Sequence, residues 1–395
     1  MPSFKSNVFF TVMKIVFVSN FLNDHQLPLC LELIDLIGKD NFQFVATTPI
    51  SSNRISLGFE DMNETRDFVV KAYVSNEEYL KAENLANEAD VVIIGSAPYS
   101  FVRERLRRNK LTFIYAERLF KQGKLSLFYP PKFVKIYNLY TKNRNKNCYL
   151  LCASAYSKDD ASFCGFPADK CYKWGYFPDV EQYADFETVI KKKSCINNGT
   201  PQILWAGRFI DWKHPEVAVH VANELKKQGN SFKLIMVGDG PMRYKIQDIV
   251  SAQELQDCVK IVGSKSPRDV RILMEESDIF LFTSDKNEGW GAVLNESMNA
   301  GCIVIANYSI GSVPFLIDNA VNGYYYKKND SSYIVDLIKL VIKDSNLQRL
   351  IAIEANRTIS ERWDAKTAAQ NLLYLIDSIN ANARLSIVDG PCSKA

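Results

Sequence analysis

The sequence is poor in the residues from which metal sites and disulfide frameworks are built. It has only three histidines in 395 residues, and no two of its nine cysteines are spaced as Cys-x-x-Cys. A structural zinc site needs four such ligands at short spacings, so we expect none here. An odd number of scattered cysteines is typical of reduced thiols. These absences predict a cytoplasmic protein.

Long hydrophobic runs are also missing. No apolar run reaches the length of a membrane-spanning helix, and Lys14 interrupts the apolar patch near the N-terminus, so we expect no signal peptide. The composition is nevertheless globular, with 47% hydrophobic, 24% charged and 12% aromatic residues. A chain of 395 residues is long for one domain and sufficient for two.

Short apolar runs alternate with helix-like segments along the chain. Buried strands are expected at residues 13–19, 42–47, 68–73, 90–95, 111–115, 148–154, 201–206, 232–237, 259–263, 278–282 and 302–306. Strands that alternate with helices predict parallel sheets with helices on both faces, and hence an α/β fold class. No G-x-G-x-x-G follows the first strand, so the first domain is not expected to bind a dinucleotide.

Composition and the positions of loop-forming residues divide the chain into six parts. The polar run at 191–200 is expected to be a loop before a second domain. The expected parts are an N-terminal extension at 1–12, a Rossmann-like acceptor domain at 13–180, a linker at 181–200, a Rossmann-like nucleotide-sugar domain at 201–362, a helix at 363–382 that crosses back to the first domain, and a tail at 383–395.

One stretch combines two glutamates with closely spaced glycines. Glu288 follows the strand at 278–282, and Glu296 lies eight residues later in an expected helix that stops at Gly301. A helix N-terminus after a parallel strand favours a phosphate, and a carboxylate can accept hydrogen bonds from a diol. The two side chains therefore suit a nucleotide ribose and a sugar. Alternatively, Glu288 caps the helix and Glu296 lies on a solvated face.

Two cations follow the first strand of the second half. Arg208 and Lys213 lie in one loop between a strand and a helix. Cations at this edge can neutralise a diphosphate as negative charge develops on it. The alternative interpretation is ordinary surface charge.

Together these motifs resemble those of the retaining GT-B glycosyltransferases of family 4. Glu288 and Glu296 match the E-x7-E motif, Gly207, Arg208 and Lys213 match G-R-x-x-x-x-K, and 238–241 is similar to a G-x-G-P turn. The resemblance is strong over 201–326 and weak over 13–180. It implies a GT-B fold, in which two Rossmann-like domains face each other across a cleft.

The resemblance also implies a donor site on the second domain. Arg208 and Lys213 would hold the diphosphate, Glu296 the ribose and Glu288 the donor sugar. The expected donor-binding residues are Arg208, Lys213, Gly238, Gly240, Gly263, Ser264, Glu288, Gly289, Trp290, Gly291, Ala292 and Glu296. The family requires no metal, which agrees with the absence of an Asp-x-Asp motif.

In the first domain, short polar side chains follow the strands at 13–19 and 111–115. Asn20, Asn23 and His25 follow the former, and Glu117 follows the latter, at the edge where such sheets bind ligands. We expect these four residues on the acceptor side, and His25 joins Glu288, Arg208 and Lys213 as a catalytic candidate because the family often has a histidine near the donor sugar. Alternatively, His25 is structural and Glu117 caps a helix.

The charge of the first half is uneven. Residues 101–146 contain 13 basic residues and only two acidic ones, and 118–158 contain nine basic residues and no acidic one, interleaved with aromatics. An anionic membrane surface attracts such a segment. The alternatives are a solvated basic face over a core stripe and a nucleic-acid surface, although no nucleic-acid-binding module occurs.

The sequence therefore predicts a retaining, metal-independent hexosyltransferase without a cofactor. Its partners would be a nucleotide-sugar donor, a glycan or polyprenyl-linked acceptor and an anionic membrane surface, with no nucleic acid. It would act in polysaccharide biosynthesis in the cytoplasm, at the inner face of the membrane. The alternatives are a nucleotide-sugar epimerase of the same two-lobed fold and a non-catalytic nucleotide-sugar-binding protein.

Overall fold

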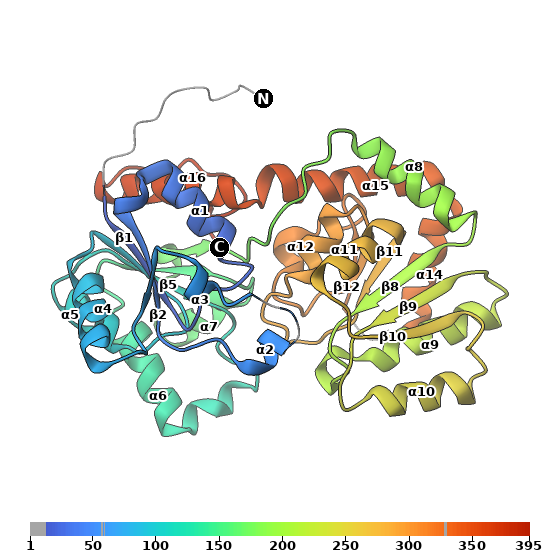
Figure 1. Ribbon diagram of the computed structural model, residues 1–395, viewed down its shortest axis with the longest axis horizontal. Helices are drawn as coiled ribbons and strands as arrows, with labels where there is room; N and C mark the ends of the chain where they lie inside the picture. The colour runs from blue at the N-terminus through green and yellow to red at the C-terminus, as the bar shows by residue number, and fades with distance from the viewer. Residues whose placement is uncertain (1–12, 57, 59, 328–329) are drawn as a thin grey trace.

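Two parallel sheets, each covered by helices on both faces, lie side by side (Figure 1). The computed structural model describes residues 13–56, 58, 60–327 and 330–395. The expected extension at 1–12 lies outside these residues. Two Rossmann-like domains were expected, and the two sheets confirm the α/β fold class.

The first domain has a seven-stranded sheet in the order β3-β2-β1-β4-β5-β6-β7. Its strands are β1 (Ile15–Ser19), β2 (Phe42–Ala46), β3 (Val69–Lys71), β4 (Val91–Ile94), β5 (Thr112–Ala116), β6 (Cys148–Cys152) and β7 (Cys171–Lys173). Its helices are α1 (Leu27–Ile37), α2 (Ser52–Ser56), α3 (Met62–Thr65), α4 (Asn76–Glu88), α5 (Ser100–Arg107), α6 (Pro130–Ile136) and α7 (Ser157–Phe163). Among the strands of this sheet, the sequence reasoning missed only β7, a short strand at the edge.

The second domain has a six-stranded sheet in the order β10-β9-β8-β11-β12-β13. Its strands are β8 (Gln202–Ala206), β9 (Lys233–Val237), β10 (Val259–Gly263), β11 (Ile279–Phe282), β12 (Ile303–Asn307) and β13 (Tyr324–Tyr326). Its helices are α8 (Phe186–Asn197), α9 (Pro215–Lys227), α10 (Arg243–Ala252), α11 (Pro267–Glu276), α12 (Val293–Asn299), α13 (Val313–Leu316), α14 (Ser331–Lys343) and α15 (Ser345–Arg357).

The central strands are buried because helices cover both faces of each sheet. Every residue of β1, β4, β11 and β12 is buried, which explains why these strands read as continuous apolar runs. All strand pairs are parallel, so the carboxyl ends of the strands lie along one edge of each sheet. The loops that follow β1, β8 and β11 carry most of the predicted site residues.

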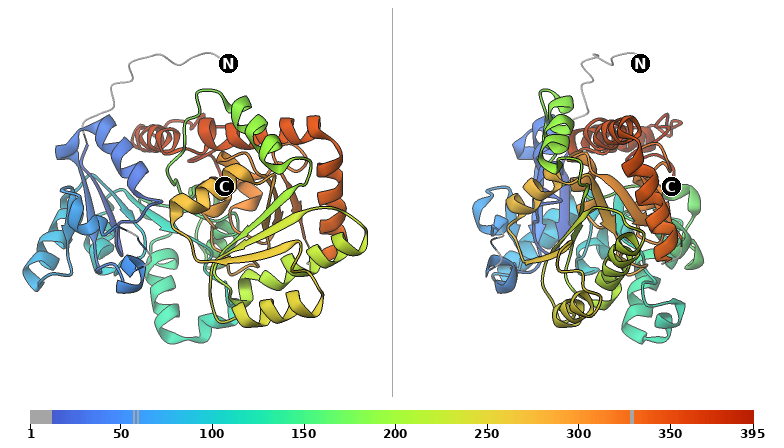
Figure 2. Two further views of the ribbon diagram at one scale, coloured as in Figure 1. Left: turned by 45° about the vertical axis from the view of Figure 1, so that its right-hand side comes forward. Right: turned by 90° about the vertical axis from the view of Figure 1, so that its right-hand side faces the viewer.

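The last helix joins the two domains. α16 (Ala365–Asn380) follows α15 of the second domain and packs against α1 of the first. Figures 1 and 2 show these red helices running from one domain to the other. The buried face of α16 includes Leu372, Leu373 and Ile376, so the crossing buries an apolar stripe.

The expected loop at 191–200 is wrong, because most of it is helical. Asp185 caps α8 by accepting a hydrogen bond from the Glu187 amide, and Asn198 ends the helix in a left-handed conformation. The polar composition misled the prediction. Lys193 is buried and donates hydrogen bonds to the carbonyls of Met274 and Ser277, at 3.0 and 2.8 Å.

The segment expected as a tail is packed onto the first domain. Lys394 forms an antiparallel bridge with Tyr172 of β7, and Cys392 is fully buried. The C-terminal residues thus cover the edge of β7, where unpaired backbone groups would otherwise face water. All nine cysteines are free thiols.

Candidate functional site

The loops after β8 and β11 are held together by hydrogen bonds. The Asp285 amide donates to the Trp212 carbonyl at 2.9 Å, and the Thr283 hydroxyl donates to the Lys213 carbonyl at 2.6 Å. The indole of Trp205 donates to the same hydroxyl at 2.8 Å. Because β8 and β11 are neighbours in the sheet, these bonds bring together two loops that are 75 residues apart.

An ion pair joins the two predicted motifs. The Lys213 ammonium contacts Oε2 of Glu288, and the two side chains are only 13% and 11% exposed. The Ser284 hydroxyl donates a second hydrogen bond to the same oxygen at 3.0 Å. In this sheltered position a cation and a carboxylate each lower the cost of burying the other. Lys213 and Glu288 therefore form one charged centre.

Arg208 supplies a second cation beside this centre. Its side chain is exposed, and its guanidinium carbon lies 5.9 Å from the centroid of the Trp212 ring. The ammonium of Lys213 lies 4.8 Å from the same centroid. Among the described residues, no carboxylate forms an ion pair with Arg208. The N–H groups of this guanidinium can therefore donate hydrogen bonds to a bound anion.

Glu296 differs from Glu288 because its carboxylate has no partner among the described residues. It lies in the first turn of α12 and is half-buried. Burial raises the pKa of this carboxyl, Asp24 of the first domain raises it further, and Arg271 lowers it. A carboxylate that is desolvated but still able to accept hydrogen bonds is suited to a neutral diol.

The glycines of the second domain allow close backbone approach. A methyl group on Gly238 would lie 1.8 Å from the Gly207 carbonyl oxygen, and one on Gly240 would lie 2.6 Å from the Phe209 carbonyl oxygen. These two positions therefore pack the turn after β9 against the Arg208 loop. The Gly238 amide donates to the Gly263 carbonyl at 2.9 Å, and Ser264 is exposed beside it.

Trp290 has a place that the sequence did not predict. Its side chain is fully buried and lies near Tyr176 of the first domain and Trp363, with ring centroids 6.2 and 5.8 Å away. Its indole donates to the Asn295 amide oxygen at 2.9 Å. The indole therefore packs beneath the loop after β11 and stabilises it. Gly291 and Ala292, which follow it, are partly exposed.

The first domain meets this loop directly. A methyl group on Gly289 would lie 1.9 Å from Oε2 of Glu117, so the Glu117 carboxylate lies against the Gly289 backbone. Oε1 of Glu117 accepts a hydrogen bond from the Tyr176 hydroxyl, and Lys121 pairs with Oε2. Glu117 thus faces the second domain, and its carboxylate is already partnered on both oxygens.

His25 lies in the loop after β1, close to the same boundary. Its ring stacks on Tyr176 with centroids 5.0 Å apart and planes inclined by 8°. Its Nδ1 is buried and has no hydrogen-bond partner among the described residues. Burial lowers the pKa of His25 to about 4. The imidazole is therefore neutral at physiological pH, and its buried Nδ1 is unpartnered among the described residues.

The two asparagines of this loop accept hydrogen bonds from neighbouring residues of the first domain. The Asn23 side-chain oxygen accepts from the His25 amide at 3.1 Å, and the Asn20 side-chain oxygen accepts from the Ser19 hydroxyl at 3.1 Å. Both residues lie at the carboxyl end of β1, as expected, and remain partly exposed.

Sequence reasoning did not single out two residues that the structure brings to this site, Tyr176 and Ser284. Tyr176 lies in the segment that leads out of the first domain, and only the fold brings it between His25, Glu117 and Trp290. Ser284 stands four residues before Glu288, a signal visible in the sequence.

Part of the chain is similar to a known family of proteins. Residues 186–358 match the family described as glycosyl transferases group 1. This match covers most of the second domain. The amylovoran biosynthesis glycosyltransferase AmsK of Erwinia amylovora is 29% identical over 183 residues, which are 45% of this chain and 45% of that protein. A second relative is a Salmonella typhimurium protein named "Putative colanic acid biosynthesis glycosyltransferase WcaL". It is 22% identical over 184 residues, which are 45% of each chain. The chain thus matches about half the length of these relatives.

Solved structures extend the similarity beyond residues 186–358. Anabaena Alr3699/HepE, solved in complex with UDP and glucose, superimposes with a TM-score of 0.64 at 17% identity, covering 93% of this chain and 100% of that one. WaaG, a glycosyltransferase involved in lipopolysaccharide biosynthesis, gives a TM-score of 0.60 at 14% identity, covering 92% and 99%. The chain therefore has the two-domain GT-B fold, as the motif resemblance predicted.

The described residues contain neither a cluster of metal ligands nor a membrane-spanning helix. Within residues 13–327 and 330–395, apart from 57 and 59, no group of three or more His, Cys, Asp or Glu side chains is arranged to hold a metal ion. None of the helices described in these ranges is both long and apolar enough to cross a membrane.

Proposed function

We propose that the protein transfers a hexose from a nucleoside diphosphate sugar to a hydroxyl of a glycan or lipid-linked saccharide. The observation that carries this proposal is the sheltered ion pair between Lys213 and Glu288, with Arg208 beside it. A pair of cations and a carboxylate at one sheet edge matches the chemistry of a sugar diphosphate, which is anionic at one end and rich in hydroxyls at the other.

The donor would be held by charges of the second domain. Arg208 and Lys213 would bind the diphosphate, and the departing nucleotide would leave with its negative charge neutralised. When Lys213 turns to the diphosphate, the Glu288 carboxylate becomes free to accept from sugar hydroxyls. The unpartnered carboxylate of Glu296 would accept from the ribose diol. Each role uses a hydrogen-bonding capacity that the described contacts leave open or only partly filled.

The first domain would supply neutral contacts to the transferred sugar. His25 is uncharged at neutral pH, so its free Nδ1 can accept a hydrogen bond without adding charge to the site. Asn20 and Asn23 lie in the same loop and Glu117 faces the Gly289 backbone. Contact between the domains at this point would exclude water and favour transfer over hydrolysis.

We further propose that transfer retains the anomeric configuration and uses no metal. Both features come from the motif resemblance, and the two cations provide a metal-free means of stabilising the leaving diphosphate. The names of the relatives support polysaccharide biosynthesis as the process, and the Anabaena structure with UDP makes UDP the first nucleotide to test. A polyprenyl-linked acceptor would bring a cytoplasmic enzyme to the inner face of the membrane.

A thermal-shift panel of UDP, GDP, ADP and their sugars tests the donor site. We expect one nucleotide to raise the melting temperature of the wild type and to raise that of Glu296→Gln by clearly less. Glu276→Gln, a glutamate of α11 outside the site, is the matched control and should keep the response. If no nucleotide at millimolar concentration shifts the wild type, the donor-site proposal is wrong.

The two alternatives separate by their products. An epimerase would convert the nucleotide sugar without an acceptor, and a binding protein would leave it unchanged. Incubation of a radiolabelled nucleotide sugar with and without a polyprenyl-linked saccharide distinguishes them. We expect label to move to the acceptor and free nucleotide to form in equal amount.

A further inference from the structure

A segment of the first domain projects away from both sheets. It comprises a 3-10 helix (Lys124–Phe128), α6, and the turn of π-helix that follows (Tyr137–Thr141), and we call it the 124–141 segment. Figures 1 and 2 show α6, in turquoise, at the lower end of the molecule in every view. The segment thus presents a surface that the rest of the chain does not cover.

This surface is unusually apolar for one facing water. Six large hydrophobic side chains of the segment are exposed: Leu125 78%, Phe128 84%, Tyr129 65%, Phe133 53%, Val134 53% and Tyr137 46%. Phe133 and Tyr137 are one helical turn apart and stack in the open, with ring centroids 6.2 Å apart and planes inclined by 15°. Contiguous exposed apolar groups of this kind mark an interaction surface, whereas single exposed residues do not.

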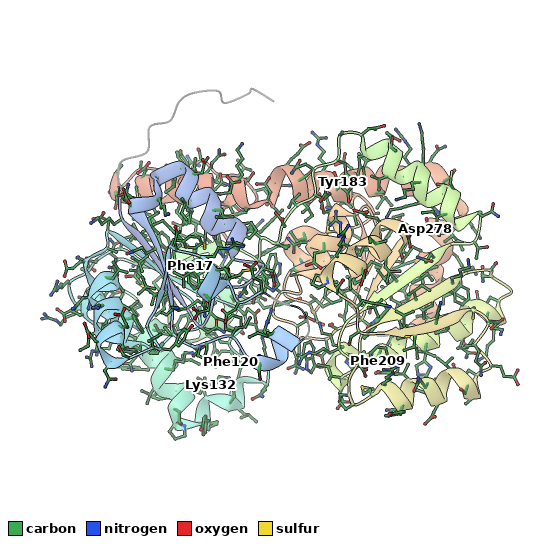
Figure 3. All side chains as sticks on the ribbon, viewed as in Figure 1. Phe17, Phe120, Lys132, Tyr183, Phe209 and Asp278 are labelled. Atoms are coloured by element: carbon green, nitrogen blue, oxygen red, sulfur yellow. The ribbon has the colours of Figure 1, made fainter. Side chains whose placement is uncertain are left out.

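The inner side of the segment is firmly anchored. Ile136, Leu139 and Tyr140 are buried in the core of the first domain together with Phe120. Lys132 donates to the Ser126 hydroxyl at 2.6 Å and lies over the Phe120 ring, so it ties the 3-10 helix to α6. Figure 3 labels Phe120 and Lys132 where α6 joins the domain. The exposed side chains are therefore held outward on a rigid support.

Positive charge surrounds the apolar side chains. No aspartate or glutamate occurs between residues 118 and 158, whereas nine lysines and arginines do. Lys124, Lys135, Lys142 and Arg144 are exposed, and no ion pair of the described residues involves them. Lys124 also lies 4.0 Å from the centroid of Phe163, another exposed aromatic ring, which extends the surface to α7.

We propose that the 124–141 segment docks on an anionic phospholipid bilayer, with Phe128, Tyr129 and Phe133 in the interface and the lysines at the headgroups. Charge complementarity selects this occupant, because unpaired cations around an apolar patch match a negative surface above a hydrocarbon layer. Aromatic side chains prefer the boundary between these two regions. A second copy of the chain would bring like charges together.

Docking of the 124–141 segment would hold the proposed transferase at a membrane, and this role rests on the proposed function. The test uses the full chain and phosphatidylcholine vesicles with or without phosphatidylglycerol, in a sedimentation assay. We expect binding only to vesicles that contain phosphatidylglycerol. Removing one lysine charge should weaken binding about fivefold at low salt.

Two pairs of variants separate the apolar and ionic contributions. Phe128→Ser combined with Phe133→Ser should weaken vesicle binding by about tenfold or more, since both side chains are exposed and no longer enter the interface. Tyr244→Ser, an exposed aromatic residue of α10 in the second domain, is its matched control and should bind as the wild type does. Lys135→Gln should weaken binding, and Lys192→Gln on α8 should not.

The outcomes distinguish this proposal from the proposed donor site. Vesicle binding that is lost in the 124–141 variants, with the nucleotide thermal shift intact, supports docking. Wild-type protein that ignores phosphatidylglycerol vesicles, or serine variants that still bind them fully, overturns it. A dimer in gel filtration that becomes a monomer in the serine variants would instead assign the surface to a second copy. Loss of the nucleotide shift alone would count only against the donor site.

Discussion

The loops after β1 and β8 occupy equivalent places in the two sheets, yet they carry different chemistry. Each follows a strand at the centre of its sheet and leads into a helix. The loop after β8 carries Arg208 and Lys213, whereas the loop after β1 carries Asn20, Asn23 and the neutral His25. One is suited to a diphosphate and the other to hydroxyl groups.

This difference shows that the backbone geometry alone does not decide what each domain binds. Both sheets offer the same edge, with amides and strand ends directed at a ligand. The side chains placed there divide the tasks, and the function lies in the site rather than in the fold. Substitutions in the loops of each domain can therefore separate the two tasks.

Removing the Lys213 cation of the second domain should have the largest effect on transfer. Lys213→Ala should lower transfer about 100- to 1000-fold, because the leaving diphosphate loses a preorganised positive charge. It should also destabilise the fold by about 3 kcal/mol, since Glu288 is left in a sheltered site without its partner. Steady-state kinetics and urea unfolding measure the two effects.

A double variant separates these consequences. Lys213→Met with Glu288→Gln removes both charges and should recover most of the stability but none of the activity. Lys227→Ala, which removes an exposed partner of Glu224, is the control and should change neither quantity. Full activity in Lys213→Ala would contradict the assignment of the diphosphate to this loop.

The unpartnered glutamate should show opposite effects on binding and stability. Glu296→Gln should weaken nucleotide affinity about 10- to 100-fold, because a charge-assisted hydrogen bond to the ribose is lost. Its melting temperature without ligand should stay equal or rise, since burial disfavours the charged carboxylate. Calorimetric titration and thermal unfolding test this; a strong loss of stability would instead indicate a structural role.

The histidine of the first domain should make stability depend on pH. Its pKa is lowered to about 4 from 6.5, so between these values the unfolded chain binds a proton that the folded chain does not. This contribution is full above the unfolded value and is lost as the pH falls, by about 2 kcal/mol between about pH 7 and pH 5. His25→Gln should flatten this part of the curve measured by urea unfolding, and an unchanged slope would show that His25 is accessible to protons.

The smallest effect is expected at the contact between the domains. Tyr176→Phe keeps the stacking on His25 but removes the hydrogen bond to Glu117, which Lys121 still partners. Stability should fall by about 1 kcal/mol, and nucleotide affinity should stay unchanged because the donor charges lie on the other domain. If Tyr176→Phe also weakened nucleotide binding, the contacts of the first domain and the donor site of the second would not be independent.

Apolar runs and motif spacing were sufficient to predict every strand except β7 and β13, the alternation of strands with helices, and the donor motifs. Buried parallel strands require continuous apolar runs, so β1, β4, β8, β11 and β12 could be read directly. The polar run at 191–200 was misread because α8 has few apolar residues and buries a lysine against carbonyl groups. Local composition does not reveal such a partner.

Which side chains meet depends on the three-dimensional fold. Lys213 and Glu288 are distant in sequence, and Tyr176, Glu117 and Gly289 come from three segments that the fold alone brings together. Trp290 was predicted to contact the donor, and only the fold shows that its side chain is buried beside Trp363 and Tyr176. Periodicity is a local property that one strand or helix carries, whereas pairing, burial of charge and pKa depend on neighbours contributed by the whole chain.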